Sequence, residues 1–364
     1  MSSAFKTSTV ARIVAVSLAL ASLEACADET PPPQPPPQPP PVAIAPPPPP
    51  PVDTTPPPQP PKPSLAELEL AALKRWNAAL NAHDPQAYSA LFTPDAVRKV
   101  PGGPDVSGHE AIAKAVGDLF AREPDCKFAA SRVFQKGNVV VVTWVRTATD
   151  SGTGGADGKP SGRPIGIDGA VVFWFTDDGL IKEQHIYSDG ATVRAQVDPK
   201  AKAGTFRPPT ALPSSTEVIA SGSSDEDKLL AFGKAYYATL DSHKVSEIMA
   251  PVTDDSVMVD LTMPDEIKGT KAFKAMVGTF LKALPDFHQP LTGQWAIGDT
   301  LITEGTTEGT LKGALGPIRP TGKPVSVHFL DIVQFKEGKF VRGVTYSNGI
   351  ELLTQVGMIK PAKK

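Results

Sequence analysis

The sequence predicts an α+β fold that occurs twice, each copy having N-terminal helices packed on one face of a curved antiparallel sheet. Three observations support this prediction. Short motifs recur in the same order about 160 residues apart, a length typical of a whole domain. Each copy opens with apolar residues at helical spacing, and each continues with β-branched runs typical of strands.

The duplication rests on matched motifs. They are His83 and His243, Gly108 and Gly269, Pro124-Asp125 and Pro285-Asp286, Gly162-Arg163-Pro164 and Gly322-Lys323-Pro324, and Tyr187-Ser188-Asp189-Gly190 and Tyr346-Ser347-Asn348-Gly349. The two copies therefore form an internal alignment. Residues that agree indicate the fold, and residues that differ are candidates for chemistry.

Residues 1–26 are typical of an export signal, with Lys6 and Arg12 ahead of a short apolar run. The segment ends at Leu23-Glu24-Ala25-Cys26, which resembles the bacterial lipobox, whose cysteine is lipidated. We therefore expect an anchor at Cys26 and a place in the cell envelope, at the periplasmic face or in the outer membrane. Glu24 departs from the lipobox pattern, so ordinary secretion is the alternative.

Residues 27–63 form a proline-rich segment, with 21 prolines among the 33 residues from Pro31 to Pro63. Such a segment favours polyproline II and reaches on the order of 100 Å when extended. We interpret it as a stalk. A docking site for a proline-recognising partner is the other interpretation.

Composition excludes several classes of function. Once Cys26 is acylated, Cys126 has no partner for a disulfide. A net charge of −3 without a basic cluster argues against nucleic acid as a partner. No glycine-rich phosphate loop or dinucleotide motif is present, so we expect no cofactor.

The helices come first in each copy. A long amphipathic helix from Leu65 to Leu80 follows Ser64, which can cap it with Glu67 in a capping box, and the second copy begins in the same way after Ser224-Asp225. A short helix carrying Tyr88, Leu91 and Phe92 follows, and then a helix over 111–120 or 271–284.

The strands follow the helices. Residues 139–145, 170–175 and 182–187 are rich in β-branched and aromatic side chains, with a turn signal at 176–179. We place the first domain at 64–198, a linker at 199–223 and the second domain at 224–364.

These motifs in this order resemble the SnoaL-like polyketide cyclases of the nuclear-transport-factor-2-like superfamily. They are the glycine that opens the third helix, the following Pro-Asp, the segment Pro320 to Pro324 and the closing Tyr-x-Asp-Gly. The resemblance covers about 75–195 and 230–358. It implies two cone-shaped α+β barrels, each with an apolar cavity.

The resemblance also implies an Asp near the end of the last strand as general base and a His on the preceding strand. The Asp position falls on Asp189 and Asn348, and the His position on Asp168 and His328. Neither copy keeps both residues.

Strand alternation gives a prediction of its own. If 176–179 is a four-residue hairpin loop, Asp168 pairs with Tyr187, and both share a face with His185 and Asp189. Crowded carboxylates in an apolar cavity would have at least one raised pKa, which suits proton abstraction beside a carbonyl. Asp189 is then the candidate base, with Asp168, His185 and Tyr187 in support. The alternative is that Asp189 is a solvated turn residue.

In the second copy the same reasoning places His328, Tyr346 and Asn348 on one face, with His328 paired to Tyr346, as ligand-binding candidates. Asp331 falls on the opposite face, where we expect a structural contact. Ser188 points away from His185 and Asp189, which disfavours a catalytic triad. His185 and Asp189 lack further ligands for a metal.

We therefore expect an exported protein that binds a small apolar or amphipathic molecule in its cones, with cofactor-free cyclase or isomerase chemistry of the aldol type as the enzymatic version. The alternative is an interaction module of the cell envelope whose sheets pair with each other, with a partner protein or in a homodimer.

Overall fold

The computed structural model describes residues 62–152 and 159–359. The predicted signal segment, Cys26 and nearly all of the stalk lie outside these residues. Within them, no helix is both long enough and apolar enough to cross a bilayer.

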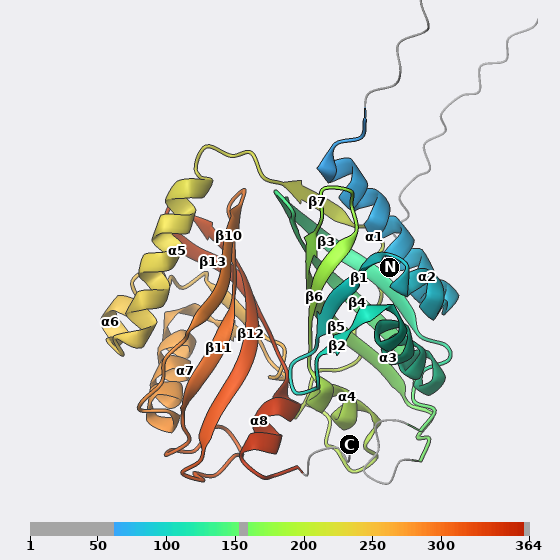
Figure 1. Cartoon of the computed structure of the whole chain (residues 1–364). Helices are drawn as coiled ribbons and strands as arrows, with labels where there is room; N and C mark the ends of the chain where they lie inside the picture. Colours follow the sequence, from blue (N-terminus) through green and yellow to red (C-terminus); the bar gives the residue numbers. More distant parts are fainter. Residues whose placement is uncertain (1–61, 153–158, 360–364) are drawn as a thin grey trace, which may run out of the picture. The chain divides into compact units, whose positions relative to one another are not determined.

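The first repeat contains α1 to α4 and β1 to β6 (Figure 1). Their bounds are α1 (Leu65–Ala82), α2 (Pro85–Ser89), β1 (Phe92–Lys99), β2 (Val106–Ser107), α3 (Gly108–Arg122), β3 (Lys127–Lys136), β4 (Val139–Thr149), β5 (Pro164–Phe175), β6 (Ile181–Ser188) and α4 (Gly190–Val197). The second repeat has the same order: α5 (Glu226–Asp241), α6 (Val245–Ile248), β8 (Val257–Asp260), β9 (Ile267–Lys268), α7 (Gly269–Ala283), β10 (Leu291–Ile297), β11 (Thr300–Thr310), β12 (Pro324–Lys336), β13 (Lys339–Ser347) and α8 (Gly349–Gln355).

Local chemistry explains how the long helices begin. The expected capping box at α1 is present, since Ser64 Oγ accepts from the amide of Glu67 and the Glu67 side chain returns to the amide of Ser64. The second copy differs, because Asp225 makes no capping hydrogen bond. Instead the buried Glu226 carboxylate accepts from the amides of Gly222, Ser223 and Gly298.

The second helix is shorter than expected. It ends at Ser89, and Phe92 already begins β1. Asp84 caps it with Pro85 at its first position, which fixes where it starts.

Each repeat builds one sheet, with strand orders β2-β1-β6-β5-β4-β3-β7 and β10-β11-β12-β13-β8-β9. The α+β prediction is confirmed, but the sheets are mixed. Four strands of each repeat are antiparallel neighbours, whereas β1 and β8 lie parallel to β6 and β13. The linker also contributes a strand, β7 (Glu217–Ala220), which pairs in parallel with β3.

The expected strand pairings are wrong by two residues, while the predicted faces are correct. Ala170 pairs with Tyr187, and Leu330 pairs with Tyr346. A bulge next to each hairpin, between Trp174 and Phe175 in the first copy, shifts the register by one residue. The hairpin itself shifts it by another, because Phe175 pairs with Ile181. A shift of two residues leaves every side chain on its original face.

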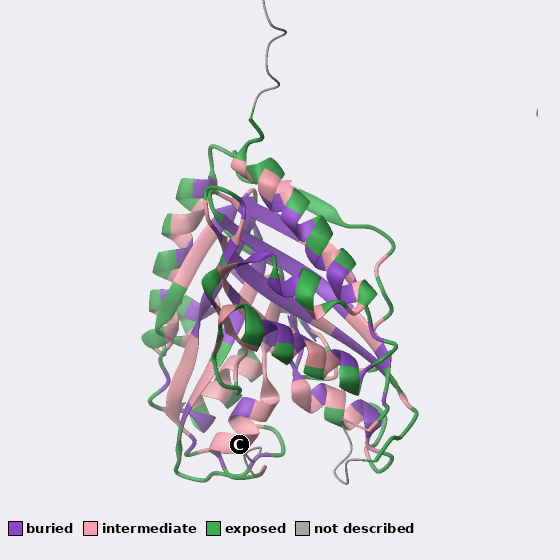
Figure 2. Ribbon diagram, turned by 45° about the vertical axis from the view of Figure 1, so that its right-hand side comes forward, coloured by how far each residue is buried: buried purple, intermediate pink, exposed green. Residues whose placement is uncertain are grey.

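Apolar cores form on both faces of the sheets. One face of the first sheet packs under α1 to α3, with Trp76 and Phe173 in edge-to-face contact at 5.6 Å. Figure 2 shows most of this sheet as buried. The opposite face meets the second sheet, because one cluster of buried side chains joins Tyr187 and Val172 with Leu330 and Tyr346. Helices α1 to α3 and α5 to α7 thus lie outside, the two sheets face each other, and α4 and α8 lie next to each other at one end of the sheets (Figure 1).

Candidate functional site

The face predicted to carry chemistry in the first repeat lies between the two sheets. Tyr187 is 3% exposed in the cluster shared by both repeats, and Tyr346, its counterpart, is 5% exposed in the same cluster. Alternation therefore identified the face, but the second repeat covers it.

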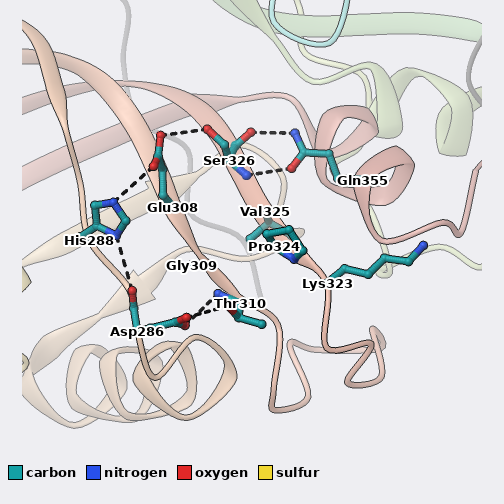
Figure 3. A pocket seen from close by; sticks show the side chains of 10 residues that line it. All are labelled: Asp286, His288, Glu308, Gly309, Thr310, Lys323, Pro324, Val325, Ser326 and Gln355. Carbon is teal, nitrogen blue, oxygen red and sulfur yellow. Dashed lines mark hydrogen bonds and ion pairs between the residues drawn. The ribbon is translucent and has the colours of Figure 1, made fainter.

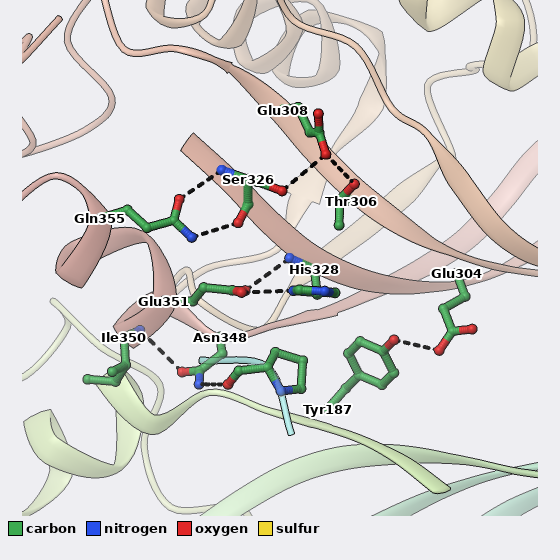
Figure 4. A network of polar contacts seen from close by, with 11 residues as sticks. Tyr187, Glu304, Thr306, Glu308, Ser326, His328, Asn348, Ile350, Glu351 and Gln355 are labelled. Carbon is green, nitrogen blue, oxygen red and sulfur yellow. Dashed lines mark hydrogen bonds and ion pairs between the residues drawn. The ribbon is translucent and has the colours of Figure 1, made fainter. Parts of the chain in front are cut away.

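His185 and Tyr187 converge on Glu304 of β11. The Tyr187 hydroxyl donates to Glu304 Oε1 at 2.6 Å, and Nδ1 of His185 lies 2.6 Å from the same oxygen. Figure 4 shows the Tyr187 contact. Burial alone would lower the pKa of His185, but the hydrogen bond and charge of Glu304 outweigh burial and raise it. Nε2 of His185 contacts Glu183 at 2.8 Å. The arrangement joins the repeats through buried polar groups.

Asp189 and Asn348 form a reciprocal pair of helix caps. Asp189, 2% exposed, accepts from Ala191 and Thr192 at the start of α4 and from the amide of Gly349 at the start of α8. Asn348 Oδ1 accepts from Ile350 on α8, as Figure 4 shows, and from the amide of Gly190 on α4. Each side chain therefore caps its own helix and contacts the helix of the other repeat.

The remaining predicted residues lie apart from one another. Asp168 accepts from the Thr210 hydroxyl at 2.6 Å. It borders, with Asp189, a cavity of about 10 Å³ that could hold one water at most. The side chain of His328 is 49% exposed and lies 2.8 Å from Glu351, whose carboxylate raises the pKa of the imidazole.

A larger pocket of about 610 Å³ lies at the far end of β11 and β12 (Figure 3). Its polar side chains pair with one another: His288 with Glu308 at 3.2 Å, and Ser326 with both Glu308 and Gln355. Few apolar side chains line it, so it is poorly suited to an apolar ligand. Across the described ranges, no group of three or more histidine, cysteine or acidic residues could hold a metal.

The inside of the second domain holds a different set of groups. Asp331 of β12 accepts from the Tyr237 hydroxyl of α5 and from the Thr345 hydroxyl of β13, both at 2.7 Å. It lies deep inside the domain yet keeps some exposed surface. Burial raises the pKa of Asp331 to about 6, and the nearby carboxylate of Asp260 acts in the same direction, although the two hydroxyls lower it.

Asp331 is part of a polar row across five strands. Consecutive pairs in the sheet register connect Gln294, Thr303, Asp331, Thr345 and Asp260, on β10, β11, β12, β13 and β8. Gln294 donates to Thr303 at 3.0 Å, and its own Oε1 has no hydrogen-bond partner among the described residues. The row lies on the face that packs under α5.

The corresponding row in the first repeat is apolar. The pair next to Ala170–Tyr187 is Val171–Ile186, just as the pair next to Leu330–Tyr346 is Asp331–Thr345. From Val171 the row continues through Val142 to Val133. The two copies therefore differ at the same level of the same face.

The apolar residues around the polar row are incompletely buried. Nine of them keep part of their surface exposed: Leu229, Leu230, Phe232, Tyr236, Leu240, Met249, Met258, Ala272 and Met276. The core inside the first domain is one cluster of 26 buried side chains and seven partly buried ones. The interior of the second domain is divided into two clusters, this one with nine buried and nine partly buried side chains and another with seven and six. A larger share of the apolar side chains inside the second domain is thus only partly buried.

One residue of this picture, Glu304, was missed from the sequence, and for another the prediction is confirmed, since Asp331 lies on the opposite face and makes structural hydrogen bonds. Both are carboxylates inside strands of otherwise uncharged residues, Ile302 to Thr307 and Phe329 to Phe335. That signal indicates a buried charge with a specific partner.

Family comparisons match the two repeats separately. The SnoaL-like domain matches residues 73–184, and the SnoaL-like polyketide cyclase matches residues 232–356. The sequence has no significant match among curated proteins.

Several solved structures are similar to this chain. AclR from Streptomyces galilaeus is 24% identical, covers 38% of this chain and 87% of its own, and has a TM-score of 0.35. IdmH from Streptomyces antibioticus is 25% identical over 35% of this chain and 97% of its own, with a TM-score of 0.33. A SnoaL-like protein from Jannaschia sp. CCS1 is 11% identical over 38% of this chain and 98% of its own, with a TM-score of 0.35.

Proposed function

Since this chain belongs to the SnoaL-like family, with two tandem domains of the nuclear-transport-factor-2-like superfamily, we propose that it binds a small apolar or amphipathic molecule inside its second domain. The polar row centred on Asp331 carries the proposal. Ligand sites combine apolar walls with a few placed polar groups, and the partly exposed apolar residues around this row fit that description.

The first domain is a poorer host. Its interior is filled by buried aromatic side chains, including Trp76, Phe173 and Trp144. The face of its sheet that lies against the second sheet is where Asp189, Asp168 and His185 were expected to act. It is covered by the second sheet, and the polar groups there are hydrogen-bonded. We therefore place the proposed ligand in the second domain rather than the first.

The proposed chemistry is proton transfer. With a pKa of about 6, Asp331 is mainly ionised at pH 7. A base whose pKa lies near the working pH is suited to accept a proton from a carbon next to a carbonyl. Each of its oxygens accepts one hydrogen bond and keeps a second lone pair. The hydroxyls of Tyr237 and Thr345 hold the carboxylate in place. This would support cofactor-free cyclase or isomerase activity.

A binding experiment tests the proposal. We expect the protein to bind Nile red, a neutral apolar dye, and to carry a small molecule in native mass spectra when purified from its own host. Ala272→Phe, which places a ring among the partly buried residues, should weaken dye binding. Ala275→Phe, on the exposed side of the same helix, is the matched control. Equal binding by both variants would place the dye elsewhere and contradict the proposal.

The interaction-module alternative is supported by the shared core of the two sheets and by the contacts of Glu304. These contacts favour pairing of the two sheets with each other through the face opposite to the helices. Separate expression of residues 64–198 and 222–364 tests it. The pairing requires that the halves associate on mixing, and halves that remain separate would exclude it.

We also propose that Cys26 anchors the chain to a membrane, on the pattern Leu23-Glu24-Ala25-Cys26. Cys26→Ser should move the protein from the membrane fraction to the soluble fraction and change its mobility. Unchanged fractionation would favour ordinary secretion.

A further inference from the structure

Seven aromatic rings form a connected series inside the second domain. Phe273 contacts Phe340, Phe340 contacts Phe335, and Phe335 contacts both Phe232 and Tyr236, with ring centroids between 5.0 and 6.2 Å apart. Tyr236 then contacts Tyr237, which stacks on Phe329 at 6.3 Å. The series leads from the apolar interior to the polar row, because Tyr237 donates to Asp331.

The charged groups at the end of this series are carboxylates. Asp331 and Asp260 both lie deep inside the domain, and each has a pKa raised chiefly by burial. Asp331 also feels the charge of Asp260, but no cation contributes to its shift. Asp260 is next to Arg207, whose guanidinium donates to the Asp260 carbonyl oxygen and whose charge lowers the pKa of the Asp260 carboxyl without overcoming the effect of burial. The surroundings of Asp331 are therefore electronegative.

Aromatic faces and an underneutralised carboxylate together favour one class of ligand. A cation over an aromatic face is attracted by the ring quadrupole, and the attraction grows when water is excluded. An anion would be repelled by Asp331 and Asp260. We propose that the molecule bound in the second domain is an organic cation, an amine or quaternary ammonium compound, with its charge near Asp331 and its apolar part against Phe232 and Tyr236. This inference rests on the proposed function and specifies the ligand class of the same site.

The lining is adaptable as well as aromatic. Met249, Met258 and Met276 are partly buried beside the rings. Thioether side chains are flexible and polarizable, so they adjust to ligands of different shape. They also supply a measurement, because isotope-labelled methionine methyl groups report contacts by NMR.

The test compares two molecules of the same shape. Choline carries a permanent positive charge, and 3,3-dimethylbutan-1-ol is its neutral isostere. Titrated into the full chain at pH 7.5, choline should shift the methyl signals of Met258 and Met276 and bind at least about tenfold more tightly than the alcohol. Met358, which is 57% exposed, is an internal control whose signal should not move.

Variants assign the preference to particular groups. Asp331→Asn keeps the size of the side chain and removes its charge, so it should abolish most of the preference for choline. Asp225→Asn removes the same charge from a surface site and should not. Tyr236→Leu keeps an apolar side chain but removes the ring. It should weaken the binding of choline and leave the binding of the alcohol unchanged. It provides an independent test if Asp331→Asn fails to fold.

The pH dependence is a second readout. Choline does not titrate, so its affinity should rise as pH increases through about 6, where Asp331 ionises. The other titratable groups facing Asp331 are Asp260 on β8 and the tyrosines of α5. Burial raises the pKa of Tyr236 to about 12 and that of Tyr237 well above its usual value, so both stay neutral in this range. The alcohol should show no such rise.

The outcomes separate the two proposals. If the alcohol binds as tightly as choline at Met258 and Met276, the ligand class is wrong and the proposed binding site remains. If choline binds with unchanged affinity in both Asp331→Asn and Tyr236→Leu, the inference is also wrong. If choline, the alcohol and Nile red all leave the interior methyl signals unchanged, both the inference and the proposed function are overturned.

Discussion

The interiors of the two domains differ at equivalent positions of their sheets, where one has an apolar row of side chains and the other a polar row. In the first, Val133, Val142, Val171 and Ile186 form an apolar row inside a filled core. In the second, the row is Gln294, Thr303, Asp331, Thr345 and Asp260, inside a core with many partly exposed side chains. Duplication therefore kept the fold while one copy was filled and the other was given polar groups. Buried polar groups cost stability unless they are paired, and in this row Gln294 pairs with Thr303, and Asp331 with Tyr237 and Thr345.

The largest expected effect comes from placing the carboxylate of the second interior at the equivalent position of the first. Val171→Asp places a carboxylate at a fully buried position of the first domain, where the neighbouring Val142 and Ile186 offer it no side-chain partner. We expect a loss of about 3–5 kcal/mol in unfolding free energy, since an uncompensated buried charge costs this much. Asp331→Val in the second domain should cost far less. Urea denaturation measures both, and similar losses would show that the interiors are equivalent.

Ring truncation tests how well each interior is packed. Trp76→Ala removes a buried ring, 4% exposed, from the first core and should destabilise by about 3–5 kcal/mol. Tyr236→Ala removes a partly exposed ring from the second and should cost about 1–2 kcal/mol, because less buried area is lost. Thermal unfolding would rank the two variants, and a larger loss for Tyr236→Ala would contradict an open second interior.

The pKa of Asp331 predicts a pH effect on stability. Folding raises it from 3.8 to about 6, so the native state holds the proton more tightly than the unfolded chain. The stability that comes from this tighter proton binding is fully present below pH 4 and is lost as pH rises through about 6. Asp331→Asn should remove this dependence of the unfolding free energy on pH. Above pH 6 the variant should be more stable than the unmodified protein by up to about 3 kcal/mol. Urea denaturation of both proteins between pH 4 and 8 measures this difference. Parallel plots of unfolding free energy against pH would show that folding does not raise the pKa of Asp331.

The smallest expected difference concerns the helix caps. Asp189→Ala leaves the amides of Ala191, Thr192 and Gly349 without their acceptor and should cost about 2 kcal/mol. Asn348→Ala removes two such acceptor contacts and should cost about 1 kcal/mol. If Asp189→Ala leaves the unfolding midpoint unchanged, capping is not the role of this residue.

Sequence reasoning predicted the parts of the fold that depend on local patterns. Two copies, the capping box at Ser64 and the face shared by His185 and Tyr187 all follow from the spacing of residues along the chain. One residue of the pairing error came from the bulge and the other from the hairpin, where Phe175 pairs with Ile181 instead of Leu180. Because the error was even, the prediction of the face survived it.

What covers each face was decided only by the tertiary structure. The face of Tyr187 was expected to line a cavity, and it is buried against Leu330 and Tyr346 of the other repeat. The opposite face, where Asp331 was expected to make a structural contact, holds Asp331 hydrogen-bonded to Tyr237. Alternation assigns a residue to one side of a sheet without showing what packs there, because period 2 is a property of one strand and burial is a property of the whole assembly of strands and helices. The sequence by itself determined the duplicated fold, and the packing of helices and sheets determined which face of each sheet is covered by helices and which by the other repeat.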